Sequence, residues 1–141
     1  MNGMKIGMKK RKIIEKEGKF YTVRGVELTR NFHTMTESEY FSMILSSLRR
    51  TTRFWKPVLI ALEKARRPNN SDNKRLKYQY QCNLCKAWCP RSLVQVDHIV
   101  PCGGIKNYES IVPWLKRAHV EKGFQVLCKE CHKIKTKKER K

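Results

Sequence analysis

Three short motifs between residues 82 and 136 decide the fold: CNLC at 82–85, VDHIVP at 96–101 and LCKECHKIKT at 127–136. Two Cys-x-x-Cys turns bracket this stretch, and paired turns of this kind bring four thiolates into the tetrahedral geometry that zinc prefers. The sequence therefore predicts a structural zinc site whose ligands are Cys82, Cys85, Cys128 and Cys131. A disulfide framework, or cysteines with no shared role, is the alternative.

The interval between the two cysteine pairs is longer than a simple zinc ribbon needs, which indicates that something else is built into it. Asp97 and His98 stand in that interval at the end of a predicted strand, and His132 directly follows the last zinc cysteine. An Asp-His pair alone is more often structural. If zinc anchors the following helix against the strands, His132 lies near both residues. A carboxylate and an imidazole can then bind a divalent ion, and a neutral imidazole can accept a proton from water.

Segment 82–136 resembles the HNH endonucleases, which form the ββα-metal nuclease superfamily. The resemblance rests on residues that recur in order: Cys82, Cys85, Asp97, His98, Ile99, Pro101, Gly103, Gly104, Leu127, Cys128, Cys131, His132 and Lys135. It implies structural Zn²⁺ on the four cysteines and a catalytic Mg²⁺ or Mn²⁺ on Asp97 and His132. It also implies that His98 is the general base that activates water against a DNA phosphodiester. The helical extension resembles, more loosely, the N-terminal part of small phage and prophage HNH proteins, through Arg49-Arg50, Trp55-Lys56-Pro57 and Ala65-Arg66-Arg67.

One position departs from the family pattern. The family's middle Asn, which helps to orient the general base, stands five residues before the third zinc cysteine, and this chain has Gly123 there. Asn107 is a candidate to replace it from the loop. His119 is interpreted as a loop histidine, because lone histidines seldom bind metal. Cys89 and Cys102 are interpreted as free thiols, since a structural zinc site closes at four ligands.

The predicted fold class is α+β: a zinc-anchored ββα-metal module with an N-terminal basic helical extension. The expected domains are a basic arm at 1–35, the helical extension at 36–76 and the HNH module at 77–141. Strands are predicted at 93–97 and 124–127, with a long loop between them and a short helix after Cys128. A short strand is predicted at 20–23 within the arm.

The helical extension begins with a capping box formed by Thr36 and Glu39. Pro57 either opens a second helix at its first turn or kinks a continuous one. The aromatic residues Phe54 and Trp55 are expected in the core. The polar segment 68–73 is interpreted as a linker between the extension and the cysteine-bearing module.

The charge balance points to a polyanionic partner. The chain has 32 Lys+Arg against 12 Asp+Glu, a formal net charge of +20, and neutralising phosphates releases condensed counterions. Nucleic acid is the leading candidate for this partner, and a membrane surface is the second. A solvated charged face is the alternative for the helical cations. The predicted DNA contacts are Arg49, Arg50, Arg53, Lys56, Arg66, Arg67 and Lys135.

The leading hypothesis is a metal-dependent DNA endonuclease with nicking activity. The alternative is a non-catalytic, zinc-stabilised DNA-binding accessory protein, with phage packaging or replication proteins as possible partners, and the third is an RNA-binding zinc protein. Asp97, His98 and His132 favour the nuclease, because a pure binder does not need them. No apolar run could span a bilayer and no signal peptide is visible, so we expect a soluble protein in the cytoplasm of a bacterial host.

Overall fold

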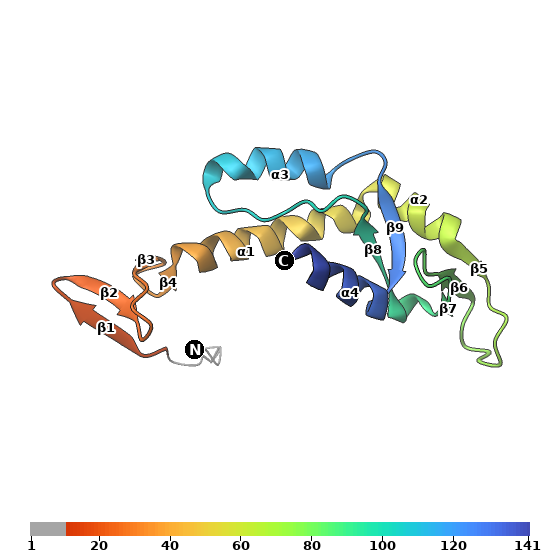
Figure 1. The fold of residues 1–141 in the computed structure, drawn as a ribbon, viewed down its shortest axis with the longest axis horizontal. Coiled ribbons are helices and arrows are strands. Elements are labelled where there is room, and N and C mark those ends of the chain that lie inside the picture. Colours follow the sequence, from red (N-terminus) through yellow and green to blue (C-terminus); the bar gives the residue numbers. More distant parts are fainter. Residues whose placement is uncertain (1–10) are drawn as a thin grey trace, which may run out of the picture. The chain divides into compact units, whose positions relative to one another are not determined.

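The computed structural model describes residues 11–141, so the first ten residues of the expected basic arm lie outside it. The chain is mixed α+β, as the sequence predicts, with helices and short antiparallel strands (Figure 1). It divides into two compact units between Ile44 and Leu45. This division falls inside helix α1 (Glu37–Arg49) and differs from the expected boundaries at residues 36 and 77.

Two antiparallel hairpins occupy most of the first unit. They consist of β1 (Ile13–Lys16) with β2 (Lys19–Thr22), and β3 (Leu28–Arg30) with β4 (Met35–Thr36). The two-residue turn after β1 needs positive φ at both positions, and Glu17 (52°) and Gly18 (75°) supply it. Strand β2 confirms the strand predicted at 20–23, while the hairpins as a whole were not predicted for this arm.

Helix α1 starts at the predicted capping box. The backbone amide of Glu39 donates to Thr36 Oγ1 (3.2 Å), and Glu39 Oε2 accepts from the Thr36 amide (2.9 Å). The Glu39 carboxylate also pairs with the Arg11 guanidinium. Leu28 and Phe41, each 1% exposed, form the core of the first unit.

The second unit begins with a short 3₁₀ helix (Arg50–Phe54) and helix α2 (Lys56–Ala65). Trp55 is extended between them and Pro57 lies in the first turn of α2, so the prediction that this proline opens a second helix is confirmed. Trp55 is partly buried, but Phe54 is 82% exposed, and the prediction that Phe54 belongs to the core is wrong.

A three-stranded sheet follows α2, in the order β5 (Arg66–Pro68), β6 (Tyr78–Gln81) and β7 (Trp88–Cys89). The segment at 68–73 is therefore not a linker between domains. It belongs to the loop that turns β5 back onto β6, and the Asn69 amide donates to the Lys77 carbonyl (3.0 Å) across its base. Strand pairing on both sides of this polar segment overrides the composition that suggested a linker.

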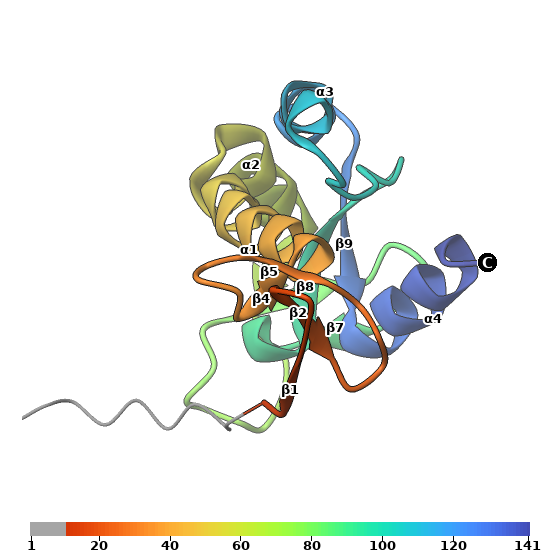
Figure 2. The same ribbon diagram turned by 90° about the vertical axis from the view of Figure 1, so that its left-hand side faces the viewer.

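The candidate site residues Asp97, His98 and His132 lie on one strand ladder and on the helix after it. Strands β8 (Val94–His98) and β9 (Phe124–Cys128) pair antiparallel, with Val94 opposite Cys128 and His98 opposite Phe124. Both match the predicted strands within one or two residues. Helix α4 (Lys129–Glu139) follows β9 directly and packs against both strands, and α2 lies on the other side of the ladder (Figure 2). Because α2 packs on β8 and β9, it belongs to the unit that carries the cysteines.

The sequence predicted a long loop between β8 and β9, and this prediction is wrong in part. Residues 111–118 of this segment form helix α3 (Ile111–Ala118). Its buried residues are Trp114 and Ala118, four apart, so one face of the helix packs inward. Pro113 lies in the first turn, where the missing amide costs no intrahelical bond. The Trp114 indole donates to the Gly103 carbonyl (3.2 Å) and fixes the glycine-containing stretch against α3.

Candidate metal centre and the cluster beside it

The four predicted zinc cysteines come together. The sulfurs of Cys82, Cys85, Cys128 and Cys131 all lie within 4.8 Å of one another, and Cys85 Sγ is 3.8 Å from Cys128 Sγ. Four thiolates at about 2.3 Å from a tetrahedral zinc stand about 3.8 Å apart, so this cluster can hold a zinc ion. Within the described residues, no other group of three or more His, Cys, Asp or Glu side chains is arranged for a metal.

Local backbone structure explains why these sulfurs meet. Cys82 and Cys85 lie on the turn between β6 and β7, and the Asn83 amide donates to the Val126 carbonyl (2.8 Å), which fastens that turn to β9. Cys128 ends β9 and caps α4, because its sulfur accepts from the Cys131 amide (3.5 Å). The second pair thus lies on the junction between the ladder and the helix.

Proton affinity also favours a cation in this cluster. Burial alone would raise the pKa of the Cys82 thiol. Hydrogen bonds from the backbone amides of Cys128, Cys85 and Leu84 outweigh burial and lower the pKa to about 6. The hydrogen bond with Cys128, then burial, raises the pKa of Cys131 to about 12. Four sulfurs this close do not all ionise unless a positive ion enters. Cys89 and Cys102 lie outside the group, and burial raises the pKa of both.

Asp97 lies at the centre of a second cluster, between β8 and α4. One carboxylate oxygen, Oδ1, faces His132 Nε2 at 3.6 Å. The other oxygen, Oδ2, accepts from Lys135 Nζ (2.9 Å) and from Gln125 Nε2 (3.3 Å). The carboxylate is therefore divided, with one oxygen held by neutral and cationic donors and the other directed at a histidine.

Lys135 is enclosed by this cluster. Its side chain is 17% exposed, its ammonium also donates to the His98 carbonyl (3.0 Å), and it pairs with Glu139 one turn further along α4. Burial lowers the pKa of Lys135, but the hydrogen bonds with Glu139 and Asp97 outweigh it and the pKa is raised, so the ammonium stays charged. Lys135 thus lies inside the site, where the sequence predicted a DNA contact.

His98 is held by one ring nitrogen. Its Nε2 lies 2.8 Å from the carbonyl oxygen of Ala118, at the end of α3, and its ring packs on Phe124 with centroids 4.6 Å apart. A carbonyl oxygen only accepts, so Nε2 carries the proton in the neutral ring and Nδ1 carries the lone pair. Among the described residues, no hydrogen bond engages Nδ1.

The structure also shows what surrounds Gly123 and Asn107. Gly123 has φ +98° and its carbonyl accepts from the Ile99 amide (2.8 Å), so this residue supports the strand end through its backbone. Asn107 caps the 3₁₀ helix Tyr108–Ser110 by accepting from the Ser110 amide (2.9 Å). The contact on His98 comes from the Ala118 carbonyl, which no side-chain motif could have revealed.

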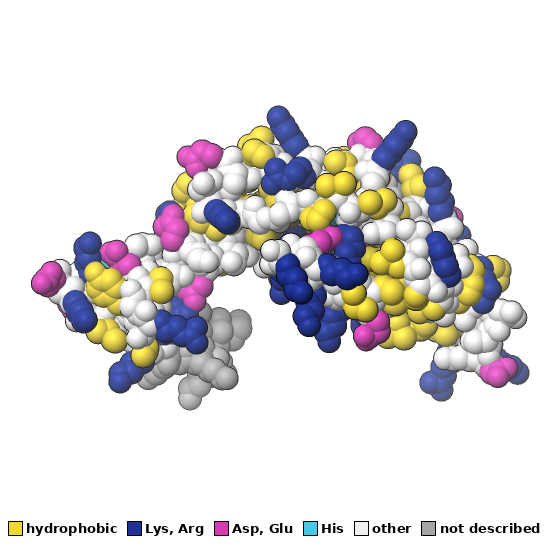
Figure 3. Space-filling model, in the orientation of Figure 1, with side chains coloured by type: hydrophobic (Ala, Val, Ile, Leu, Met, Phe, Trp, Pro, Cys, Tyr) yellow, Lys and Arg dark blue, Asp and Glu magenta, His cyan; other side chains and the backbone are white. Residues whose placement is uncertain are grey.

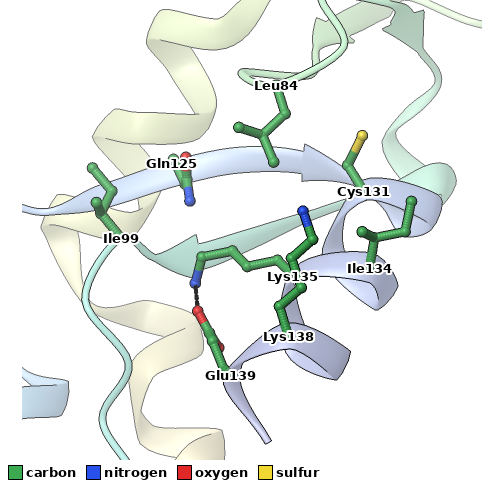
Figure 4. Close-up of a pocket in the computed structure, with 8 residues that line it drawn as sticks. All are labelled: Leu84, Ile99, Gln125, Cys131, Ile134, Lys135, Lys138 and Glu139. Atoms are coloured by element: carbon green, nitrogen blue, oxygen red, sulfur yellow. Dashed lines mark hydrogen bonds and ion pairs between the residues drawn. The ribbon is translucent and has the colours of Figure 1, made fainter. Parts of the chain in front are cut away.

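A groove of about 530 Å³ adjoins the Asp97 cluster. Figure 4 shows the aliphatic side chains of Leu84, Ile99 and Ile134 around it, with Lys135 between them and Glu139. Lys138 lines the groove from the next turn of α4. Apolar walls beside charged groups are typical of ligand-binding surfaces.

The predicted DNA contacts divide into two groups. Arg49, Arg50, Arg53 and Lys56 are exposed. Arg66 stacks on Tyr78 (4.5 Å) and pairs with Glu63, while Arg67 stacks on Trp88 (3.9 Å) and donates to Gln79. In the view of Figure 3, Lys and Arg side chains gather over α4, which sequence reasoning had represented only by Lys135.

Charge is distributed unevenly along the chain. Residues 45–141 hold 23 Lys+Arg and 7 Asp+Glu, a net of +16, whereas residues 11–44 hold 6 and 5, a net of +1. The excess positive charge of the described chain therefore belongs to the second unit.

No protein-family model, curated protein or solved structure matches this chain. Within residues 11–141, none of the helices combines the length and the apolar character needed to cross a lipid bilayer.

Proposed function

We propose that the chain is a metal-dependent DNA endonuclease of the HNH type, built on a ββα-metal module formed by β8, β9 and α4. The observation that carries the proposal is the geometry around Asp97. Its Oδ1 faces His132 Nε2 at 3.6 Å, and the neighbouring residue His98 has its Nε2 engaged and its Nδ1 unengaged. A metal ligand pair beside an oriented base is the minimal equipment for phosphodiester hydrolysis.

Asp97 Oδ1 and His132 Nε2 would hold a single Mg²⁺ or Mn²⁺. Two neighbouring ligand atoms of one octahedral ion, each about 2.1 Å from the ion, are about 3 Å from each other. A small side-chain shift would bring Asp97 Oδ1 and His132 Nε2, which are 3.6 Å apart, to this separation. Once bound, such an ion supplies positive charge to the scissile phosphate and to the leaving oxygen. Two protein ligands leave most coordination positions to water and substrate.

His98 would act as the general base. With Nε2–H donating to the Ala118 carbonyl, Nδ1 accepts a proton from water, and the water oxygen attacks phosphorus. The bond from phosphorus to the 3′ oxygen breaks, and the leaving oxygen takes a proton from solvent water, which gives 3′-hydroxyl and 5′-phosphate ends. One such site acts on one strand at a time, so the expected product on duplex DNA is a nick.

Lys135 and Gln125 would position Asp97. Both donate to Oδ2, so Oδ1 is the oxygen directed at the metal position. Groups that hydrogen-bond to a metal ligand set its orientation, and losing them typically costs 10–100-fold in affinity or activity. The DNA itself would lie over the exposed cations of the second unit, in keeping with its net charge of +16.

The deciding experiment is nicking of supercoiled plasmid by the full chain in Mg²⁺ or Mn²⁺, with EDTA and His98→Ala as comparisons. We expect metal-dependent nicking and a loss of about 10²–10⁴-fold in His98→Ala. Zinc content and thermal unfolding of the variant must match the parent, so that the loss reports the base. Equal cutting by His98→Ala, or equal cutting in EDTA, rejects this mechanism.

A second candidate is a zinc-stabilised DNA-binding protein without catalysis. The observation that favours it is the ion pair between Lys135 and Asp97 (2.9 Å), which satisfies a partly buried carboxylate with no metal. Tight, salt-dependent DNA binding with no cleavage in either metal would establish this candidate and reject the nuclease.

A further inference from the structure

Three consecutive residues at the C-terminal end of α3, Ala118 to Val120, are each fastened to another element. The Ala118 carbonyl accepts from His98 Nε2 (2.8 Å). The His119 ring lies between the Leu115 carbonyl (Nδ1, 3.2 Å) and Thr51 Oγ1 (Nε2, 2.9 Å). The Val120 carbonyl accepts from the Trp55 indole (2.8 Å).

Outside α3, the partners of His119 and Val120 come from one place, the 3₁₀ helix at residues 50–54 and the residue after it. Thr51 holds the His119 ring, and Trp55 both donates to Val120 and meets the edge of the His119 ring, with centroids 5.2 Å apart. Residues 51 and 55 thus clamp the two residues that follow Ala118.

This clamp bears on the direction of the Ala118 carbonyl. A peptide group is planar, so the carbonyl of Ala118 and the amide of His119 move together. His119 is also the residue at which α3 ends, with φ −99° and ψ 52°, and helix ends fray unless other contacts hold them. Fixing His119 and Val120 therefore fixes the acceptor that faces His98.

We propose that Thr51 and Trp55 are positioning residues for His98, acting through His119 and the carbonyl of Ala118. This inference rests on the proposed function, in which His98 is the base. Gly123 has no side chain that could orient an imidazole. The clamp would supply that orientation through residues that precede His98 in the sequence, whereas Gly123 follows it. Thr51 and Trp55 touch neither the reacting atoms nor the proposed metal ligands.

The chain offers a matched set of variants. Thr51→Val removes the hydroxyl and keeps the shape, and Thr51→Ser restores the hydroxyl. Thr52→Val is the control, because Thr52 Oγ1 donates to the Arg49 carbonyl (2.8 Å) in the same 3₁₀ helix without contacting His119. Trp55→Phe removes the indole N–H and keeps an aromatic ring.

In steady-state nicking, we expect Thr51→Val and Trp55→Phe to lower kcat about 10-fold or more with KM changed less than about twofold, because a misplaced catalytic group affects the chemical step. Thr51→Ser should recover to within about twofold of the parent, and Thr52→Val should match it. The folded fraction and zinc content of each variant must match the parent, because a loss of folded protein would also lower kcat at an unchanged KM, and the Thr51 hydroxyl also donates to the Leu48 carbonyl (2.6 Å).

A second measurement needs no DNA and no divalent metal. In ¹⁵N-labelled protein, the imidazole spectrum of His98 should show a single tautomer with the proton on Nε2, and Thr51→Val should mix the two tautomers. If kcat and the spectrum are both unchanged in Thr51→Val, the inference is wrong. If the parent cuts no DNA, the proposed function fails, and the spectrum alone decides whether Thr51 orients His98.

Discussion

In the proposed nuclease, Lys135 would serve the site without touching the substrate. Its ammonium lies against Asp97 Oδ2, and its pKa is raised although burial alone would lower it. We expect Lys135→Gln to reduce nicking about 10–100-fold, because Asp97 loses the donor that directs its second oxygen. The salt dependence of DNA binding should change little, since Lys135 is occupied by carboxylates.

Lys137→Gln is the matched control, as Lys137 lies on the same helix and is exposed. It should leave the chemical step unchanged and reduce the salt slope instead. If Lys135→Gln weakens DNA binding as Lys137→Gln does and keeps full cleavage, Lys135 is a phosphate contact, as its sequence position alone predicts.

Glu39 makes the stability of the first unit depend on pH in the acidic range. The Arg11 guanidinium, and then the Thr36 amide, lower the pKa of Glu39 from 4.5 to about 2. A lowered carboxyl pKa stabilises the fold above pH 4.5, and the contribution disappears as the pH falls toward 2. The side chains are 40% exposed, so we expect less than about 1 kcal/mol.

An NMR titration of the Glu39 carboxyl measures this directly, with an expected midpoint near 2. In Arg11→Gln the midpoint should move up toward the ordinary value, while Arg11→Lys should retain part of the shift. A midpoint near 4.5 in the parent would show that the pair does not persist in solution.

The identity of the chemical groups was readable from the sequence, but their hydrogen-bond partners were not. Sequence motifs identify the chemical groups of Cys82, Asp97 and His132. The Ala118 carbonyl and Gln125 do not, because a backbone oxygen has no residue signature and an amide on a strand is ordinary. Such partners become visible only when the register of β8 and β9 and the end of α3 are known.

The turn between β6 and β7 carries Cys82 and Cys85, and a zinc ion on the four cysteines would tie this turn to Cys128 at the end of β9. Structural zinc contributes about 10–16 kcal/mol in small domains, which is as large as the whole stability of many proteins. We expect Cys85→Ser, or a strong chelator, to unfold β8, β9 and α4 together. Zinc content, measured as one ion per chain in the parent, and circular dichroism check this.

Cys89→Ser and Cys102→Ser are the controls for the loss of a thiol. Both residues lie outside the four-sulfur group, so both variants should retain one zinc and a normal melt. Full zinc content and an unchanged melt in Cys85→Ser would show that the ion is bound elsewhere.

Elements with strong local signals were predicted well, and those formed by long-range pairing were not. The capping box fixed the start of α1, and alternation fixed β8 and β9, because both patterns act between near neighbours. The polar segment at 68–73 suggested a linker, yet β5 pairs with β6 across it. Pro113 and the nearby glycines favoured a loop in place of α3, although the four-residue spacing of Trp114 and Ala118 is typical of a helix.

The second unit carries the excess charge, and this makes a comparison between units possible. Replacing Arg49, Arg50 and Arg53 with Ala should reduce the slope of log K against log salt by about 0.9 for each lost phosphate contact. Replacing Lys12, Lys16 and Arg24 removes the same charge from the first unit, where the net charge is +1 over residues 11–44, and should change the slope less. Equal slopes for both triple variants would return the arginines to the solvated-face interpretation.

The separation of the two cysteine pairs has a consequence during synthesis. Cys85 and Cys128 are 43 positions apart, so at about 5–20 residues per second the first pair leaves the ribosome roughly 2–9 s before the second. Until then Cys82 and Cys85 form a dithiol with no partner thiolates. A nascent chain that meets an oxidant in that interval can close these two cysteines on each other, and the completed chain would then lack two of the four thiols that could hold a zinc ion. Oxidation during synthesis would therefore cost the chain this metal site.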